Sequence, residues 1–136
     1  VSSGIWGQGT CKGLAKDKLL TRCNKYLKED RIVIFDGWFS ETLPLLEEDI
    51  KFALVHIDSD LYESALQVLN YFFSKNHFAE GCMIFFDDWN CNRSSPKYGE
   101  RRAWSECLEK YNIHYSDGGD YGLAGHKMII HEYQKR

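Results

Sequence analysis

Short apolar runs alternate with longer amphipathic stretches along most of the chain. Runs rich in branched and aromatic residues, typical of buried strands, occupy residues 31–35, 52–57, 82–86 and 127–131, with a weaker run at 112–115. Apolar positions recur at helical spacing over residues 14–29, 62–75 and 99–111. This alternation predicts an α/β fold with a largely parallel sheet and helices on both faces. The last two strands are close in sequence, so we expect an antiparallel pair at one edge.

The first residues of the chain are rich in glycine. Residues 1–13 contain Gly4, Gly7, Gly9 and Gly13. A glycine loop that binds a dinucleotide follows a strand, and none is predicted before these glycines, so we expect a mobile segment. No repeat or linker divides the remainder, so residues 1–136 are expected to form one domain. Because the chain opens on Val1 without a methionine or signal peptide, we expect that domain to be partial.

Composition narrows the functional classes. The 136 residues include 17 Lys and Arg against 20 Asp and Glu, a formal charge of −3, which argues against a nucleic-acid-binding protein. A hydrophobic fraction of 43% excludes a disordered chain. No apolar run reaches the roughly 18 residues of a membrane helix. Five cysteines without CxxC spacing predict reduced thiols, and hence a cytoplasmic protein, rather than disulfides or structural zinc.

Acidic residues follow three of the predicted strands, at the ends where ligands bind to a parallel sheet. Asp36 follows the first strand, Asp58 and Asp60 follow the second, and Asp87 and Asp88 follow the third. If the second and third strands are neighbours, four carboxylates meet at one rim, and their repulsion favours a bound cation such as Mg²⁺. The alternative is that these acids cap helices or begin turns, as Asp often does.

The Asp58-Ser59-Asp60 triplet also fits other reactions. A DxD sequence after a strand occurs in metal-dependent glycosyltransferases that use nucleotide sugars and in phosphatases that form an aspartyl phosphate. A phosphorylation receiver domain is excluded, because its acid pair lies on its first strand. His56 lies within a predicted strand, and we expect it to be a hydrogen-bonded core residue rather than a catalytic one.

Three segments together resemble one enzyme family. They are residues 36–44 (DGWFSETLP), 56–64 (HIDSDLYES) and 86–89 (FDDW). In order and separation they resemble the macrocin O-methyltransferase (TylF-type) family, and the likeness covers residues 30–135. The resemblance implies a Rossmann-like class I methyltransferase sheet. It also implies transfer of a methyl group from S-adenosylmethionine to a hydroxyl of a sugar or sugar-containing metabolite.

The resemblance assigns roles to the acids. It implies that Asp58, Asp87 and Asp88 bind Mg²⁺ and that Asp60 is the general base. A metal that contacts a sugar hydroxyl lowers the pKa of that hydroxyl and orients it. A carboxylate within hydrogen-bond reach can then remove the proton. Carboxylates at adjacent strand ends suit this chemistry.

The cofactor site implied by the resemblance is incomplete in this sequence. Gly37, Trp38 and Phe39 fall in the loop that borders the cofactor's adenine, and Asp58 lies near its methionine end. The family's first two strands, which carry the glycine-rich turn and the acid that grips the ribose, have no counterpart here. The predicted strand at 31–35 then lacks its neighbour. Either it pairs with the strand at 52–57, or another chain fills the gap, or the chain is part of a longer protein.

Three functions remain open on the sequence. The first is a Mg²⁺-dependent O-methyltransferase, with residues 89–99 as its lid. The second is a metal-dependent glycosyl or phosphoryl transferase, which requires a basic cluster that the rim lacks. The third is a methyltransferase-like binding module without catalysis. An unpaired sheet edge would favour association with another chain, including a homo-oligomer.

Overall fold

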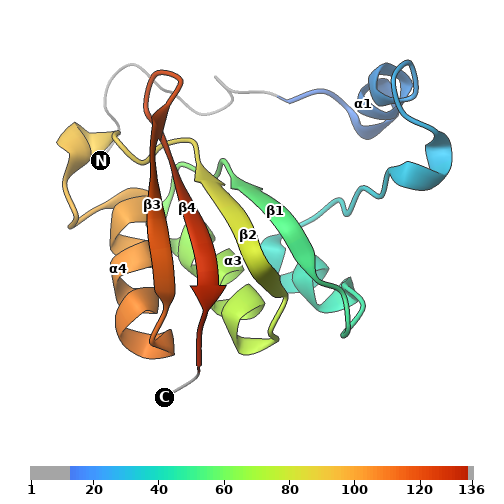
Figure 1. The fold of residues 1–136 in the computed structure, drawn as a ribbon. Coiled ribbons are helices and arrows are strands. Elements are labelled where there is room, and N and C mark those ends of the chain that lie inside the picture. Colours follow the sequence, from blue (N-terminus) through green and yellow to red (C-terminus); the bar gives the residue numbers. More distant parts are fainter. Residues whose placement is uncertain (1–12, 135–136) are drawn as a thin grey trace. The chain divides into compact units, whose positions relative to one another are not determined.

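The computed structural model describes residues 13–134, which form two compact units divided after Gly37 (Figure 1). In the first unit, helix α1 (Lys16–Cys23) precedes the 3₁₀ turn η1 (Glu29–Arg31). This helix is shorter than the predicted one over residues 14–29, and none of its residues is buried. Of the predicted mobile segment, only Gly13 lies within the described residues.

The predicted strand at residues 31–35 is wrong. Residues 32–36 have no regular structure, and the side chains of Val33 and Phe35 are exposed. A strand exists only through hydrogen bonds to a neighbouring strand, so a β-branched run without a partner remains extended chain. No strand among residues 13–134 pairs with this segment.

The second unit begins at Trp38 and contains the sheet. Its elements in chain order are α2 (Phe39–Thr42), η2 (Leu43–Leu45), β1 (Phe52–Ile57), α3 (Tyr62–Ser74), β2 (Phe78–Phe86), η3 (Asn92–Ser94), α4 (Gly99–Tyr111), β3 (His114–Tyr121) and β4 (Gly125–Glu132). The strands lie in the order β1-β2-β4-β3 (Figure 1). β1 and β2 are parallel, whereas β4 is antiparallel to both β2 and β3. The antiparallel edge pair is confirmed. β1, β2 and β3 run in the same direction and only β4 runs against them, so the strands are largely parallel in direction, although β1 and β2 form the one parallel ladder of the described sheet.

The connections between strands explain these directions. α3 returns the chain to the start of β2, so β1 and β2 run in the same direction. α4 likewise leads to β3, which lies at the far edge of the sheet. The short turn after Tyr121 then brings β4 back between β3 and β2. A turn this short joins only antiparallel strands, which gives the sheet its mixed character.

One face of the sheet packs against α3 and α4, which lie side by side behind it (Figure 1). Successive strand residues point to opposite faces, so every second residue contributes to this core. The buried apolar side chains of the strands are Val55, Ile57, Phe78, Cys82, Ile84, Phe86, Met128 and Ile130. Those of the two helices are Ala65, Val68, Leu69, Phe72, Phe73, Ala103, Trp104, Cys107 and Tyr111. No helix among residues 13–134 is both long and apolar enough to span a bilayer.

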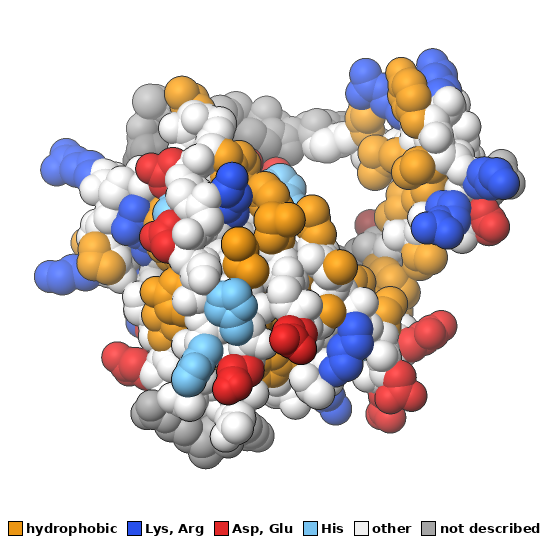
Figure 2. Space-filling view, in the orientation of Figure 1, with side chains coloured by type: hydrophobic (Ala, Val, Ile, Leu, Met, Phe, Trp, Pro, Cys, Tyr) orange, Lys and Arg blue, Asp and Glu red, His pale blue; other side chains and the backbone are white. Residues whose placement is uncertain are grey.

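The opposite face, which we call the outer face, is covered by none of the described helices of the second unit. It presents the alternate strand residues, including Leu54, His56, Met83 and Phe85. Leu54 is 54% exposed and Met83 is 38% exposed. Figure 2 looks onto this face and shows hydrophobic side chains gathered over the sheet. The expectation of helices on both faces is therefore met on one face of this unit.

Candidate active site

The parallel pairing of β1 and β2 brings two acid-bearing strand ends together. Ile57 lies opposite Phe86, and the Asp87 N–H donates to the Ile57 carbonyl at 3.0 Å. Asp58 and Asp87 therefore follow directly from paired residues. The two strands are neighbours, which is the condition under which the four aspartates were predicted to meet.

Asp60 lies in the turn between β1 and α3, where its backbone adopts a positive φ of 54°. Burial raises the pKa of the Asp60 carboxyl above its usual range, and the charge of Asp88, a hydrogen bond with Asp88 and the charge of Asp87 raise it further. A carboxylate whose pKa is raised accepts a proton more readily. Asp60 therefore has the environment of a proton acceptor.

Glu100 is a fifth acid at this place, and it was not predicted from the sequence. It is 1% exposed in the first turn of α4, where its Oε2 accepts a hydrogen bond from the Asp88 N–H at 3.0 Å. Burial raises the pKa of its carboxyl to about 8, and the charges of Asp88, Asp87 and Asp58 also raise it. Acidic residues are common in the first turn of a helix, where they interact favourably with the helix dipole. Only the place of Glu100 in the helix that follows the Asp87-Asp88 pair could have indicated that it lies near them. We call the five acids together the acidic rim: Asp58, Asp60, Asp87, Asp88 and Glu100.

Cys91 contacts the same group of acids. Its thiol donates to Asp88 Oδ1, with 3.3 Å between Sγ and the oxygen. Burial, together with a hydrogen bond to Asp88 and the nearby charges, raises the pKa of the Cys91 thiol to about 11. The thiol therefore stays protonated at neutral pH and orients one Asp88 oxygen.

His56 is not the buried core residue that the sequence predicted. It lies on the outer face, its side chain is 48% exposed, and its Nε2 is 3.5 Å from Asp87 Oδ1. The apolar residues around it in β1 indicated burial, but strand residues alternate between faces, and the described helices leave this face open. The same nitrogen is 3.2 Å from the hydroxyl of Tyr121.

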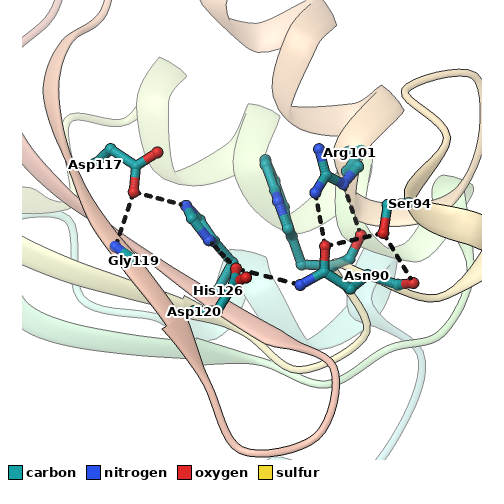
Figure 3. A network of polar contacts seen from close by, with 8 residues as sticks. Asn90, Ser94, Arg101, Asp117, Gly119, Asp120 and His126 are labelled. Atoms are coloured by element: carbon teal, nitrogen blue, oxygen red, sulfur yellow. Dashed lines mark hydrogen bonds and ion pairs between the residues drawn. The ribbon is translucent and has the colours of Figure 1, made fainter.

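A polar network beside the rim joins the β3–β4 hairpin to the loop after β2 (Figure 3). His126 on β4 lies between two carboxylates, with Nε2 3.0 Å from Asp117 Oδ1 and Nδ1 2.6 Å from Asp120 Oδ1. The Asn90 amide donates to Asp120 at 3.2 Å, and Arg101 donates to Asn90 Oδ1 at 2.7 Å. These contacts fix the loop that begins immediately after Asp88.

Trp89 anchors the same loop through its ring. The indole stacks on His126, with ring centroids 5.2 Å apart and an interplanar angle of 16°. The Arg101 guanidinium lies 4.8 Å from the centroid of the Trp89 ring, and Arg101 Nε donates to the Trp89 carbonyl at 2.9 Å. Beyond this anchor, Asn92, Arg93 and Ser94 all have positive φ, which L-residues rarely adopt. The predicted lid, residues 89–99, therefore begins at an anchored residue.

The acidic rim and the neighbouring Ser59 carry oxygen atoms of the kind that divalent cations bind. Within the described part of the chain, three buried oxygen atoms have no hydrogen-bond partner: Ser59 Oγ, Asp88 Oδ2 and Glu100 Oε1. Buried polar atoms without partners are rare, and carboxylate and hydroxyl oxygens are the hard ligands that Mg²⁺ prefers. Among residues 13–134, however, no three His, Cys, Asp or Glu side chains already surround a common metal position. A bound ion would therefore have to turn the carboxylates toward itself.

The residues implied to border the adenine are divided between the two units. Gly37 ends the first unit, and Trp38 and Phe39 begin the second. Trp38 is 77% exposed, while Phe39 lines a cavity of about 600 Å³ with residues of η2 and α3. None of the acids of the acidic rim lines this cavity. The structure thus gathers the four predicted aspartates but does not bring Phe39 to them.

A comparison with solved structures finds the same fold in the O-methyltransferase NovP. The two structures have a TM-score of 0.72 at 20% sequence identity. The likeness covers 88% of this chain and 46% of the NovP chain, so this chain spans less than half of the NovP length. Among the curated proteins, none matches the sequence.

The sequence model of one protein family, described as Macrocin-O-methyltransferase (TylF), matches residues 14–114. The match contains β1, β2, the acidic rim and α4, and it agrees with the likeness of the three motif segments. It covers well over half of the chain. The chain therefore belongs to the macrocin-O-methyltransferase (TylF) family.

Proposed function

We propose that this chain carries the metal-binding and proton-accepting residues of an O-methyltransferase. The reaction would transfer a methyl group from S-adenosylmethionine to a hydroxyl of a sugar or sugar-containing metabolite. The observation that carries the proposal is the meeting of four aspartates at two parallel strand ends in a member of this family. Because the chain spans less than half of the NovP length, the complete activity, its substrate and its cofactor all belong to the proposal.

Asp58, Asp87 and Asp88 would hold Mg²⁺. A bound divalent cation lowers the pKa of a hydroxyl that it contacts and orients the hydroxyl oxygen. The acids follow directly from paired strands, which hold their positions better than loops do. Support comes from Asp88, whose Oδ2 is buried without a partner while Oδ1 accepts a hydrogen bond from the Cys91 thiol.

Asp60 would accept the proton of the acceptor hydroxyl. Its raised pKa, caused by burial and by Asp88 and Asp87, makes it a stronger base than a solvated aspartate. Gly37, Trp38 and Phe39 would border the adenine, with Asp58 near the methionine end of the cofactor. Holding the hydroxyl oxygen close to the methyl carbon would supply much of the remaining acceleration.

Isothermal titration calorimetry of the whole chain tests the proposal. The expected result is binding of Mg²⁺ and, with Mg²⁺ present, of S-adenosylmethionine. Binding of a nucleotide sugar without S-adenosylmethionine would instead support the glycosyl transferase alternative. Failure to bind either small molecule, with a stable assembly in size-exclusion chromatography, would support the non-catalytic binding module.

A further inference from the structure

Tyr121 crosses the hairpin and lies on the outer face. It is the last residue of β3, and it pairs with Gly125, the first residue of β4. A Cβ atom added at Gly125 would lie 2.7 Å from Cε1 of the Tyr121 ring, closer than side-chain atoms approach one another. Only glycine at position 125 lets the ring pass over β4 without displacement.

The Tyr121 ring is held by β2 and points its hydroxyl toward β1. It packs edge-on against Phe85, with ring centroids 5.1 Å apart and an interplanar angle of 70°. Its hydroxyl oxygen is 3.2 Å from His56 Nε2, and that nitrogen is 3.5 Å from Asp87 Oδ1. Side chains from β1, β3 and the end of β2 therefore meet above the backbone of β4.

The Tyr121 hydroxyl also contacts Asp87 directly. It hydrogen-bonds with Asp87, the acid whose Oδ1 is 3.5 Å from His56 Nε2. A protonated phenol can donate one hydrogen bond. This donor therefore reaches the Asp87 carboxylate from the outer face of the sheet.

We infer that Tyr121 and His56 are positioning residues, which hold the Asp87 carboxylate in the orientation that binds the divalent cation. Gly125 contributes by letting the tyrosine ring reach its place. The inference rests on the proposed function, since it concerns the orientation of a proposed metal ligand. The Asp87 side chain is 48% exposed, so packing alone does not fix it. Loss of a side chain that hydrogen-bonds to a metal ligand and orients it commonly lowers metal affinity about 10–100-fold.

The test is calorimetric titration of the whole chain with Mg²⁺ alone. Tyr121→Phe keeps the ring and removes the hydroxyl, and it should weaken Mg²⁺ binding about 10-fold or more. Gly125→Ala keeps the hydroxyl but displaces the ring, and it should weaken binding to a similar extent. Tyr115→Phe is the matched control, because Tyr115 lies on the same strand but packs against Trp104, on the other face of the sheet. This control should bind Mg²⁺ as the native chain does.

A thermal melt of each variant separates positioning from folding. Tyr121→Phe should melt at the native temperature while it loses Mg²⁺ affinity. Native affinity in Tyr121→Phe, beside clear binding by the native chain, would overturn this inference and leave the proposed metal ligands intact. Absence of Mg²⁺ binding in the native chain would overturn the proposed metal ligands and this inference together.

Discussion

The backbone N–H of Asp88 donates to Glu100 Oε2 at 3.0 Å, while the other Glu100 oxygen is buried without a partner. One oxygen of this carboxylate therefore accepts a hydrogen bond. The other is removed from solvent and has no hydrogen bond to replace its hydration. Nearby negative charges make the ionised form still less favourable. The first turn of α4 thus contains a carboxyl group whose protonated, neutral form is favoured in the metal-free protein.

The stability of the metal-free chain should fall as the pH rises from about 4.5 to about 8. In this window folded Glu100 keeps its proton, while the unfolded chain releases it near the ordinary value of 4.5. The folded state binds more protons, so raising the pH favours unfolding. Glu100→Gln should remove much of this decline and stabilise the chain at alkaline pH. Urea midpoints in the presence of EDTA measure the effect.

Asp120 should act on stability in the opposite sense. Hydrogen bonds from His126 and Asn90, followed by nearby positive charge, hold the pKa of the Asp120 carboxyl below its usual 3.8. The stability it contributes is complete above that value and is lost as the pH falls through the lowered pKa. Asp120→Asn should therefore be less stable than the native chain at neutral pH, with a flatter decline in acid. Acid titrations followed by circular dichroism test this, and an unchanged profile would contradict it.

Asp87→Ala should abolish Mg²⁺ binding and leave the chain folded. The side chain is about half exposed and belongs to no apolar cluster, so its loss leaves the core intact. Calorimetric titration gives the affinity, and circular dichroism reports the fold. Asp49→Ala removes an exposed acid from a loop and serves as the control. Full Mg²⁺ affinity in Asp87→Ala would remove this carboxylate from the proposed ligands.

Asp60→Asn should lower methyl transfer by about 10²–10⁴-fold in an enzyme that turns over, because a carboxamide cannot take the hydroxyl proton. Mg²⁺ affinity should change little, since Asp60 is not among the proposed ligands. Initial rates with radiolabelled S-adenosylmethionine measure the first effect and calorimetry the second. Undiminished turnover would exclude Asp60 as the base.

Leu69→Ala should destabilise the second unit by about 2–5 kcal/mol, because it opens a cavity in a close-packed core. Leu69 is fully buried on the face of α3 that packs on the sheet. Leu61→Ala, at a position that is 61% exposed before the same helix, should cost less than about 1 kcal/mol. Urea unfolding at neutral pH compares the two, and equal costs would show that α3 does not pack as described.

Local patterns determined much of this fold. α3 and α4 match their predicted ranges closely, because both carry a continuous apolar stripe between clear ends. β3 extends to Tyr121, well beyond the predicted residue 115, through a polar, glycine-containing stretch that indicates a turn when seen alone. Pairing with the apolar β4 makes it a strand. Residues 31–35 do not form a strand for the converse reason. Their composition is typical of a strand, but no strand among the described residues pairs with them.

The part of the candidate site that follows directly from the strand ends was predictable from the sequence, and the part that depends on packing was not. The four aspartates follow from strand ends and from the order of neighbours. Glu100 and Tyr121 do not, because their part in the site depends on how α4 and the β3–β4 hairpin pack against those ends. His56 was misplaced because an apolar run does not reveal which face of a strand a helix covers.

Trp89 gives the protein a built-in optical probe. The indole is adjacent in sequence to Asp88 and stacked on one partner, with a guanidinium over its ring. A change in the charge or orientation of the neighbouring carboxylate would alter the electrostatic surroundings of this indole, on which its emission depends. If the acidic rim binds Mg²⁺ as proposed, a change in intrinsic fluorescence during titration is the expected signal, and it requires neither a label nor knowledge of the natural acceptor.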